Sequence, residues 1–483
     1  MAVSRSRFLK VIAVLYVFIS FSVFLGKSAS AENGLEMNIE KAIKDYLDEY
    51  KVPGASVAII RNNELFFSKS WGVTGESDEE VTEQTPFTIG SISKSLTAMA
   101  IMKLADNGTI SLDASIQEYL PWLTLKNGKA AEITVTQLLA QTSGFSTYDG
   151  LALSDKELTG SDAIKNQVKK LSEVELTAAP GEKHLYSNAN FLILGAMIEE
   201  LTGMSYADYM EQQIFAPLGM KYTAANKKGA YEKGYLKGFQ SWFGFPVKSF
   251  VAYDDAGAPY GYITASSEDM VQFVKVLSGN GPDHFISDKT LDLFKTPQVQ
   301  TGEDRYYGYG IRISNPDTPK ELIWHSGSTP DSHAEFFYIP ETGWGGVILT
   351  NKNHVLEEEG LYYLKEHIVS LLNDDEPEKV PNHSVTIQYI MLGCILLLVI
   401  LPIFLVKRFR IRKYFKKGTR LFLGVLFIGL SAVLIPLFTF TTSFPWHSIS
   451  VFAPDIALLT IVAVILLAIN GLLLFSLILK KSW

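Results

Sequence analysis

A serine and a lysine stand three residues apart where an extended segment gives way to an apolar-periodic helix. The segment 88–96 reads TIGSISKSL and places Ser91 and Lys94 at positions i and i+3. These positions share one face of a helix, so the Lys94 amine can reach the Ser91 hydroxyl. A serine alcohol is a weak nucleophile until a base takes its proton, and a desolvated lysine is such a base. The spacing predicts acyl-transfer chemistry at Ser91, with helix N-terminal N–H groups available to an oxyanion.

A second motif lies in a loop that opens a helix. Tyr186 and Asn188 are two residues apart there, so both side chains can point into one cleft. A tyrosine near cationic groups can ionise and act as a general base, and an asparagine can orient a substrate amide. The alternative is an ordinary turn with a packed tyrosine.

The third motif follows a strand-like run. Gly327 allows a close approach of two backbones, so the N–H of Ser328 can serve as a second oxyanion donor. His325 can donate or accept a proton near neutral pH. The alternative is a histidine that is simply packed on an apolar strand.

Hydrophobic periodicity predicts the elements that must position these motifs. Strand-like runs occur at both ends of the domain, and the first two form a hairpin around Asn62-Asn63. The runs are 55–61, 64–71, 309–313, 321–325, 334–339 and 345–350, and the helices that accompany them are 37–50, 91–104 and 356–372. We therefore predict an α/β (α+β) sandwich, with an antiparallel sheet flanked by helices and an all-helical lobe from the middle of the chain. The site would lie between the lobes.

The N-terminus predicts an export signal. Basic residues precede a long apolar run, and small residues before Glu32 offer a cleavage site, so residues 1–31 are interpreted as a signal peptide. The alternative is an uncleaved membrane anchor. Residues 32–375 would form the extracytoplasmic domain, and residues 376–386 a linker.

The C-terminal residues 387–483 predict a membrane anchor. Three apolar segments are long enough to span a bilayer, namely 387–406, 421–440 and 456–479. The loop between the first two is strongly basic, whereas the loop between the second and third has no Lys or Arg. The positive-inside rule therefore places the basic loop and the C-terminus in the cytoplasm and the large domain outside.

Charge and cysteine usage limit the partners. Residues 32–384 carry 29 Lys or Arg against 50 Asp or Glu, which disfavours a nucleic-acid partner. The only cysteine, Cys394, lies in the first apolar segment, so the external domain must be stable without disulfides.

Together the three motifs match a known family in type, order and spacing. The chain from about Ile39 to Leu372 resembles the serine β-lactamase and penicillin-binding-protein superfamily, specifically its class C β-lactamase-like branch, which includes D-Ala-D-Ala carboxypeptidases. The resemblance implies an acyl-enzyme mechanism with no metal or organic cofactor. It implies catalytic roles for Ser91, Lys94 and Tyr186, and substrate binding by Asn188, His325, Gly327 and Ser328. It leaves open whether Lys94 or Tyr186 takes the proton.

Two residues depart from the family pattern. His325 stands where β-lactamases typically carry a lysine that binds a substrate carboxylate, and histidine is mostly neutral at pH 7. Efficient β-lactamase action is therefore not expected. Gln141 replaces a histidine found in many relatives, and we expect a structural role for it.

These observations predict a membrane-anchored extracytoplasmic serine hydrolase that acts on D-alanyl peptides or esters of the cell wall, with β-lactams as further candidate ligands. One rival is an esterase or peptidase of the same fold that acts on small substrates. The other is a non-catalytic ligand-binding receptor that signals through the membrane tail.

Overall fold

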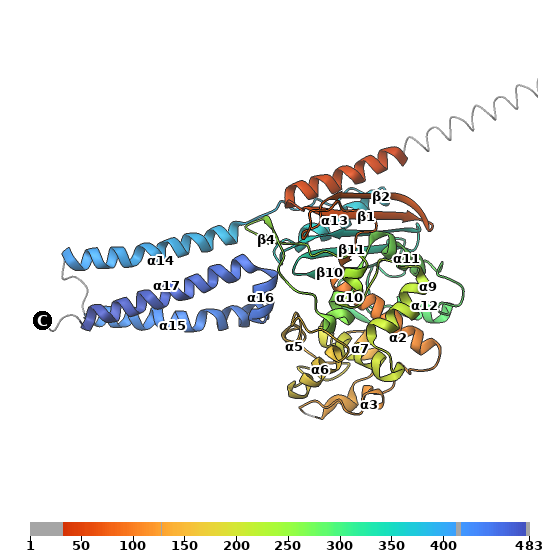
Figure 1. Ribbon diagram of the computed structural model, residues 1–483, viewed down its shortest axis with the longest axis horizontal. Helices are drawn as coiled ribbons and strands as arrows, with labels where there is room; N and C mark the ends of the chain where they lie inside the picture. The colour runs from red at the N-terminus through yellow and green to blue at the C-terminus, as the bar shows by residue number, and fades with distance from the viewer. Residues whose placement is uncertain (1–31, 127, 412–416, 480–483) are drawn as a thin grey trace, which may run out of the picture.

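The computed structural model describes residues 32–126, 128–411 and 417–479 of the 483-residue chain. A domain of sheet and helices is followed by a helical bundle that projects from one end of it (Figure 1). The predicted signal peptide, residues 1–31, lies outside the described residues.

An eight-stranded antiparallel sheet forms the centre of the domain, in the order β2-β1-β12-β11-β10-β9-β8-β7. The first two strands of the chain therefore lie beside the last, as predicted. The hairpin between β1 and β2 turns at Asn62 and Asn63, which both adopt the left-handed conformation that asparagine tolerates. The strands are β1 (Gly54–Arg61), β2 (Glu64–Gly72), β7 (Val299–Gly302), β8 (Arg305–Tyr307), β9 (Arg312–Ser314), β10 (Leu322–Thr329), β11 (Ser332–Ile339) and β12 (Trp344–Thr350).

Short strands form two smaller sheets. β3 (Phe87–Thr88) pairs with β6 (Thr264–Ala265), and β4 (Phe239–Trp242) lies between β5 (Phe245–Lys248) and β13 (Lys352–Asn353). The helices of the domain beyond residues 32–50 are α2 (Ser93–Asp106), α3 (Ile116–Tyr119), α4 (Val135–Leu139), α5 (Thr147–Ala152), α6 (Ala163–Lys169), α7 (Asn188–Thr202), α8 (Tyr206–Met210), α9 (Ala216–Leu218), α10 (Lys227–Glu232), α11 (Ser267–Leu277), α12 (Asp288–Lys295) and α13 (Glu358–Leu372).

Helices cover both faces of the central sheet. The helix at residues 32–50 and α13 bury Ile43 and Leu364 against one face. On the other face Phe273 of α11 meets Phe336 of β11 edge to face, with ring centroids 5.6 Å apart. Each fully buried side chain of this size contributes roughly 1.5–3 kcal/mol. The sandwich predicted from the sequence is confirmed.

The middle of the chain forms the predicted helical lobe. Its central helix, α7, is buried on all sides from Ala189 to Ile198, as expected for a helix surrounded by others. Helices α4, α5, α6 and α8 pack around it, and α2 joins the lobe to the sheet.

The segment around Ser91 differs in one respect from its prediction. Ser91 does not begin the long helix but lies in a single 3₁₀ turn, Gly90–Ile92, and α2 follows from Ser93. Gly90 has φ of +52°, a backbone conformation that residues other than glycine rarely adopt. The tight turn therefore depends on Gly90.

Three long helices follow the domain: α14 (Thr386–Ile411), α15 (Lys417–Thr442) and α17 (Pro454–Leu479). Each is long and apolar enough to cross a membrane, with mean hydropathy between 2.6 and 2.8. The stretch between α15 and α17 was expected to be a loop but contains a short helix, α16 (Trp446–Phe452), that lies between the bundle and the domain (Figure 1). A helix of seven residues is too short for a clear periodic signal.

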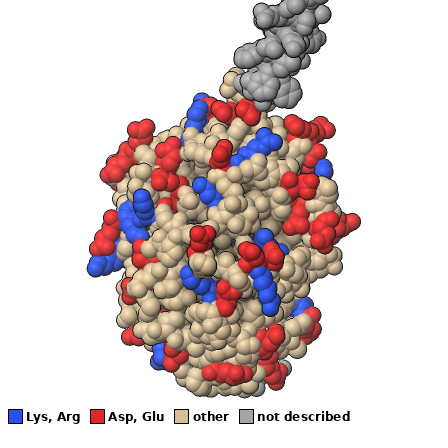
Figure 2. All heavy atoms as spheres, turned by 90° about the vertical axis from the view of Figure 1, so that its right-hand side faces the viewer, with Lys and Arg blue, Asp and Glu red and all other residues tan. Residues whose placement is uncertain are grey.

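The face of the domain turned away from the bundle carries many charged side chains (Figure 2). Figure 2 shows acidic side chains spread over this face, with basic side chains interspersed among them. It agrees with the acidic balance of the sequence, and it places no large basic patch on that face.

Candidate functional site

A cleft of about 240 Å³ brings the three sequence motifs together between the sheet and the helical lobe. Two larger hollows, of about 740 and 720 Å³, contain none of the candidate residues. Five candidates line the cleft directly, namely Ser91, Tyr186, Asn188, His325 and Ser328. Lys94 and Gly327 lie immediately behind its wall, against Ser91.

The Ser91 hydroxyl and the Lys94 amine are in contact, as their spacing predicts. The Nζ atom of Lys94 lies 2.9 Å from Oγ of Ser91 and donates a second hydrogen bond of 2.8 Å to the carbonyl oxygen of Tyr260. The Lys94 side chain is fully buried, and its amine lies 4.9 Å from the centre of the Tyr186 ring. One lysine is thus held against one hydroxyl in a dry environment.

The surroundings of Lys94 favour its neutral form. Burial lowers the pKa of the amine well below its usual value, and the guanidinium of Arg312 lowers that pKa further. Both effects act against the charged form, because a buried cation loses hydration and a second cation repels it. A neutral amine beside a hydroxyl can accept its proton.

Tyr186 has the opposite tendency. Burial raises the pKa of its phenol, and the charge of Arg312 and a hydrogen bond with Ser91 offset this only in part. The phenol is therefore protonated at neutral pH and can donate a hydrogen bond. The expectation that Tyr186 might ionise receives no support from its surroundings.

Gln141 holds the loop that carries Tyr186. Its side-chain oxygen accepts a hydrogen bond of 3.0 Å from the backbone N–H of Ser187 and another from Asn190. Asn188 begins α7 and directs its side chain into the cleft, where its amide donates to Oγ of Ser154 over 2.9 Å. Gln141 thus has the structural role expected of it.

Two glycines bring the Ser91 turn against β10. A Cβ atom at Gly327 would lie 2.0 Å from the carbonyl oxygen of Ile89 and 2.6 Å from the backbone nitrogen of Ser91. A Cβ atom at Gly90 would lie 2.1 Å from the backbone nitrogen of Ser328. The backbone nitrogens of Ser91 and Ser328 therefore both lie at the close contact between Gly90 and Gly327, at the edge of the cleft. Paired N–H groups of this kind can stabilise an oxyanion.

The surroundings of His325 favour its neutral form. Only 1% of the residue is exposed, and burial together with Arg312 lowers its pKa well below the usual range. Its Nδ1 atom lies 2.6 Å from the carbonyl oxygen of Ser326, and Nε2 lies 3.3 Å from the Tyr307 hydroxyl. His325 does not supply the positive charge that a lysine would supply at this position.

Arg312 supplies that charge, and the sequence did not reveal it. It extends from β9 into the cleft, with its guanidinium 5.5 Å from the centre of the Tyr186 ring and 5.7 Å from that of Tyr307. Among the described residues no carboxylate forms an ion pair with it, and its Nε has no hydrogen-bond partner there. A planar, unpaired guanidinium suits a carboxylate ligand.

The segment between α15 and α17 also reaches the cleft. Phe444 and Phe452 form part of its wall, and Nε2 of His447 lies 2.5 Å from the carbonyl oxygen of Asp155, another wall residue. These contacts were not expected, because the sequence predicted an anchor, with signalling through the tail as the alternative, and no contribution of the tail to the cleft. Among the described residues no cluster of His, Cys, Asp and Glu could hold a metal ion.

Comparison with known proteins agrees with this geometry. The sequence model of the beta-lactamase family matches residues 39–368. Protein flp of Staphylococcus aureus (strain N315) is 30% identical over 350 residues, which cover 70% of this chain and 67% of that protein. The octameric penicillin-binding protein homologue from Pyrococcus abyssi is 26% identical, with a TM-score of 0.64 over 71% of this chain and 78% of that chain. A class C beta-lactamase, 20% identical, shares the fold with a TM-score of 0.60 over 72% of this chain and 98% of its own.

Proposed function

This chain belongs to the beta-lactamase family, and from that membership we propose that it is a membrane-anchored serine hydrolase acting through an acyl-enzyme on Ser91. The observation that carries the proposal is the hydrogen bond of 2.9 Å between a fully buried Lys94 amine and the Ser91 hydroxyl. Few structural roles require a lysine to be desolvated beside a serine in an open cleft.

In the proposed reaction Lys94 accepts the proton of Ser91 as its Oγ attacks the substrate carbonyl. The lowered pKa of Lys94 and the raised pKa of Tyr186 both favour Lys94 as the base. The bond from the carbonyl carbon to Oγ forms, and the bond to the leaving group breaks. Tyr186, which is protonated and hydrogen-bonded to Ser91, donates its proton to the leaving group and recovers a proton from the Lys94 ammonium, so that Lys94 is again neutral. Water then releases the acyl group and regenerates the hydroxyl.

The remaining polar groups would position the substrate. The N–H groups of Ser91 and Ser328 would stabilise the oxyanion, each donor contributing about 10²–10³ in rate. Asn188 would bind the substrate amide, and Arg312 would bind a carboxylate. We propose D-alanyl peptides or esters of the cell wall as the substrate class, because a carboxylate, an amide and an acyl carbonyl then each meet a suitable group.

The membrane bundle would hold the domain beside that substrate. The apolar helices α14, α15 and α17 support membrane attachment, and we propose that the domain faces outward with the C-terminus in the cytoplasm. The contacts of α16 with the cleft favour an enzyme whose tail has a second task besides anchoring.

A second candidate function is hydrolysis of simple esters. The aromatic wall of Phe444 and Phe452 favours an apolar ligand over a β-lactam. Ester turnover without a penicillin adduct would support this alternative.

The decisive test is intact-mass spectrometry of the full chain in detergent after incubation with benzylpenicillin and, separately, with p-nitrophenyl acetate. We expect an acyl adduct in the wild type and none in the Ser91→Ala variant, whereas the exposed control Ser161→Ala should react like the wild type. An adduct that persists in Ser91→Ala would overturn the assignment. Absence of both adduct and turnover with every substrate would favour a non-catalytic receptor.

A further inference from the structure

A second, apolar cavity lies next to the cleft, at the end of the bundle that meets the domain. It has a volume of about 250 Å³, and apolar side-chain atoms form its wall. The wall comes from α14 to α17 and includes Ile387, Phe438, Ile449, Ala453 and Ile456. An engineered apolar cavity of about 150 Å³ stays dry and binds benzene, so this one has room for a short hydrocarbon chain.

The cavity adjoins the Ser91 cleft. Three residues, Val355, Phe444 and Phe452, line both spaces. A ligand with its carbonyl at Ser91 could therefore extend past these side chains into the cavity. A polar site with a cation thus lies beside a wholly apolar pocket, which is the order of groups in an amphiphile.

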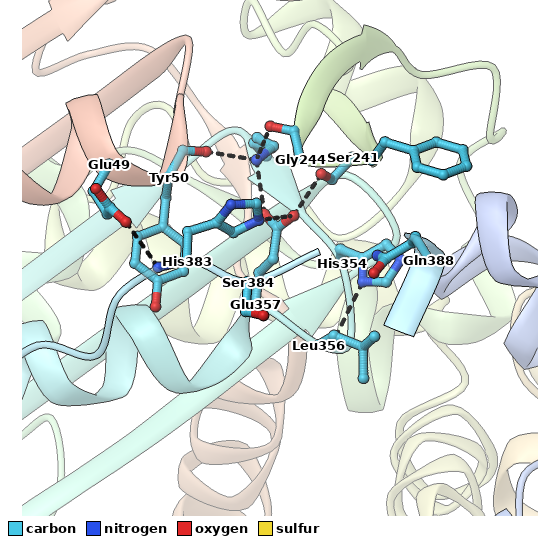
Figure 3. Close-up of polar contacts among 12 residues, drawn as sticks. Glu49, Tyr50, Ser241, Gly244, His354, Leu356, Glu357, His383, Ser384 and Gln388 are labelled. Carbon is cyan, nitrogen blue, oxygen red and sulfur yellow. Dashed lines mark hydrogen bonds and ion pairs between the residues drawn. The ribbon is translucent and has the colours of Figure 1, made fainter. Parts of the chain in front are cut away.

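Polar contacts hold the cavity wall against the domain. The backbone N–H of Val355 donates to the carbonyl oxygen of Phe452 over 3.0 Å, and Nε2 of Gln240 donates to that of Val451 over 2.7 Å. His354 lies 2.9 Å from the buried Asp455, which also accepts a hydrogen bond from Gln388. Figure 3 shows His354 and Gln388 beside each other at this junction.

The linker is fixed at the same junction. His383 lies 3.1 Å from Glu357, whose carboxylate also accepts hydrogen bonds from Lys352 and Ser241 (Figure 3). The linker between the domain and α14 is therefore seated on the domain. These contacts keep the apolar cavity next to Ser91, as a binding site requires.

We propose that this cavity is the acyl-chain subsite of the Ser91 cleft, so that the enzyme acts on fatty-acyl esters or amides whose hydrocarbon chain lies among α15, α16 and α17. The proposal rests on the proposed acyl-enzyme at Ser91, and it names a substrate for the second candidate function, ester hydrolysis, in place of a D-alanyl substrate. A bilayer collects such amphiphiles at its surface, where the ends of membrane-spanning helices lie. Each buried methylene group contributes about 0.8 kcal/mol, or about fourfold in kcat/KM when the contact is made in the transition state.

The test uses the full chain in nanodiscs and a series of p-nitrophenyl alkanoates from acetate to dodecanoate. We expect kcat/KM to rise with chain length until the cavity is full, by on the order of 100-fold from butyrate to octanoate. Ser448→Leu should fill the cavity, because Ser448 is fully buried in its wall and its hydroxyl has no hydrogen-bond partner among the described residues. This variant should lower the octanoate-to-acetate ratio at least tenfold. Ser450→Leu, on the same helix but outside the cavity wall, should keep the ratio and controls for partitioning of esters into the bilayer.

Four outcomes would decide the matter. A flat chain-length series in an active wild type would overturn the subsite while leaving the hydrolase intact, as would a ratio that Ser448→Leu leaves unchanged. A bilayer phospholipid that copurifies with the wild type but not with Ser448→Leu, together with a flat series, would show that the cavity holds a structural lipid. If Ser448→Leu fails to fold, Ala453→Leu fills the same cavity from α16's C-terminal end. No turnover at any length and no Ser91 adduct would refute the proposed function itself.

Discussion

Replacing Gly327 with alanine should abolish most of the acyl-transfer rate without unfolding the domain. A Cβ at this position would lie 2.0 Å from the carbonyl oxygen of Ile89 and 2.6 Å from the backbone nitrogen of Ser91. Both neighbours are backbone atoms in a packed turn, so they cannot rotate away. The turn and β10 must therefore separate by about 1.4 Å, from 2.0 Å to at least 3.4 Å, to reach an ordinary contact.

That separation determines how far kcat should fall in Gly327→Ala. It moves the N–H of Ser91 away from the N–H of Ser328, and loss of one oxyanion donor costs about 10²–10³ in kcat, or about 2.7–4 kcal/mol. A misplacement of about 1 Å at a reacting centre gives a similar loss, about 10²-fold. We therefore expect kcat to fall by at least 100-fold, with a smaller change in KM.

The assay is steady-state hydrolysis of p-nitrophenyl acetate by the full chain, with thermal unfolding measured on the same samples. Gly302→Ala is the matched control, because Gly302 lies in the same sheet and a Cβ there would make only ordinary contacts, 3.8 Å from Arg305. A Gly327→Ala variant that folds and retains kcat within threefold of the wild type would refute the oxyanion-hole assignment. A large loss in Gly302→Ala would show that the effect is not specific to the cleft.

Three further predictions follow from the charges. With a neutral ester, kcat/KM should fall as the pH drops through the lowered pKa of Lys94, because only its neutral amine accepts a proton. In Arg312→Met this fall should shift to higher pH, because Arg312 lowers the pKa of Lys94. An unshifted profile would contradict the role of Arg312. Arg312→Met should raise KM for a substrate with a free carboxylate about 10- to 150-fold, which corresponds to the loss of a hydrogen bond to a charged group, about 1.5–3 kcal/mol. KM for a neutral ester should not change in this way. In the control variant Arg305→Met, at an exposed residue, KM for the carboxylate substrate should also stay unchanged. Hydrogen bonds and Lys352 hold the pKa of the buried Glu357 at about 2 despite the cost of burial. Its folded pKa is depressed, so its stabilisation, about 3 kcal/mol, is present above about pH 4.5 and should be lost as the pH falls toward 2. The difference in melting temperature between wild type and Glu357→Gln should therefore shrink on acidification, and a constant difference would rule this out.

Local signals predicted the parts of the fold that local chemistry determines. Asn62-Asn63 predicted a hairpin because both residues tolerate a left-handed backbone, and the structure has both in that conformation. The contact between Ser91 and Lys94 followed from their spacing, although the turn proved to be 3₁₀ rather than α. The turn depends on Gly90 at φ +52° and packs against Gly327, which lies 236 residues from Ser91 in the sequence, so the residues around Ser91 alone do not indicate this contact.

The rest of the site depends on contacts between distant segments. The sequence placed a strand at 309–313, but alternation alone cannot say that Arg312 faces a cleft, because an arginine on a short strand is more often directed to solvent. Phe444 and Phe452 read as apolar residues of a loop between membrane segments. Only the packing of α16 against the domain places them at the cleft, and no periodic pattern in seven residues could indicate that.

The presence of Arg312 in the cleft explains why a histidine is favourable at position 325. A lysine at position 325 would share a small, largely buried cleft with Arg312 and Lys94, and three unpaired cations there would repel one another strongly at low effective dielectric. A neutral histidine removes that repulsion and still bonds Tyr307. With Arg312 as the single fixed cation, the Lys94 amine can stay neutral and act as a base. The departure from the family pattern at His325 therefore places the positive charge on β9 instead of β10, and under the proposed mechanism a substrate carboxylate would bind at Arg312.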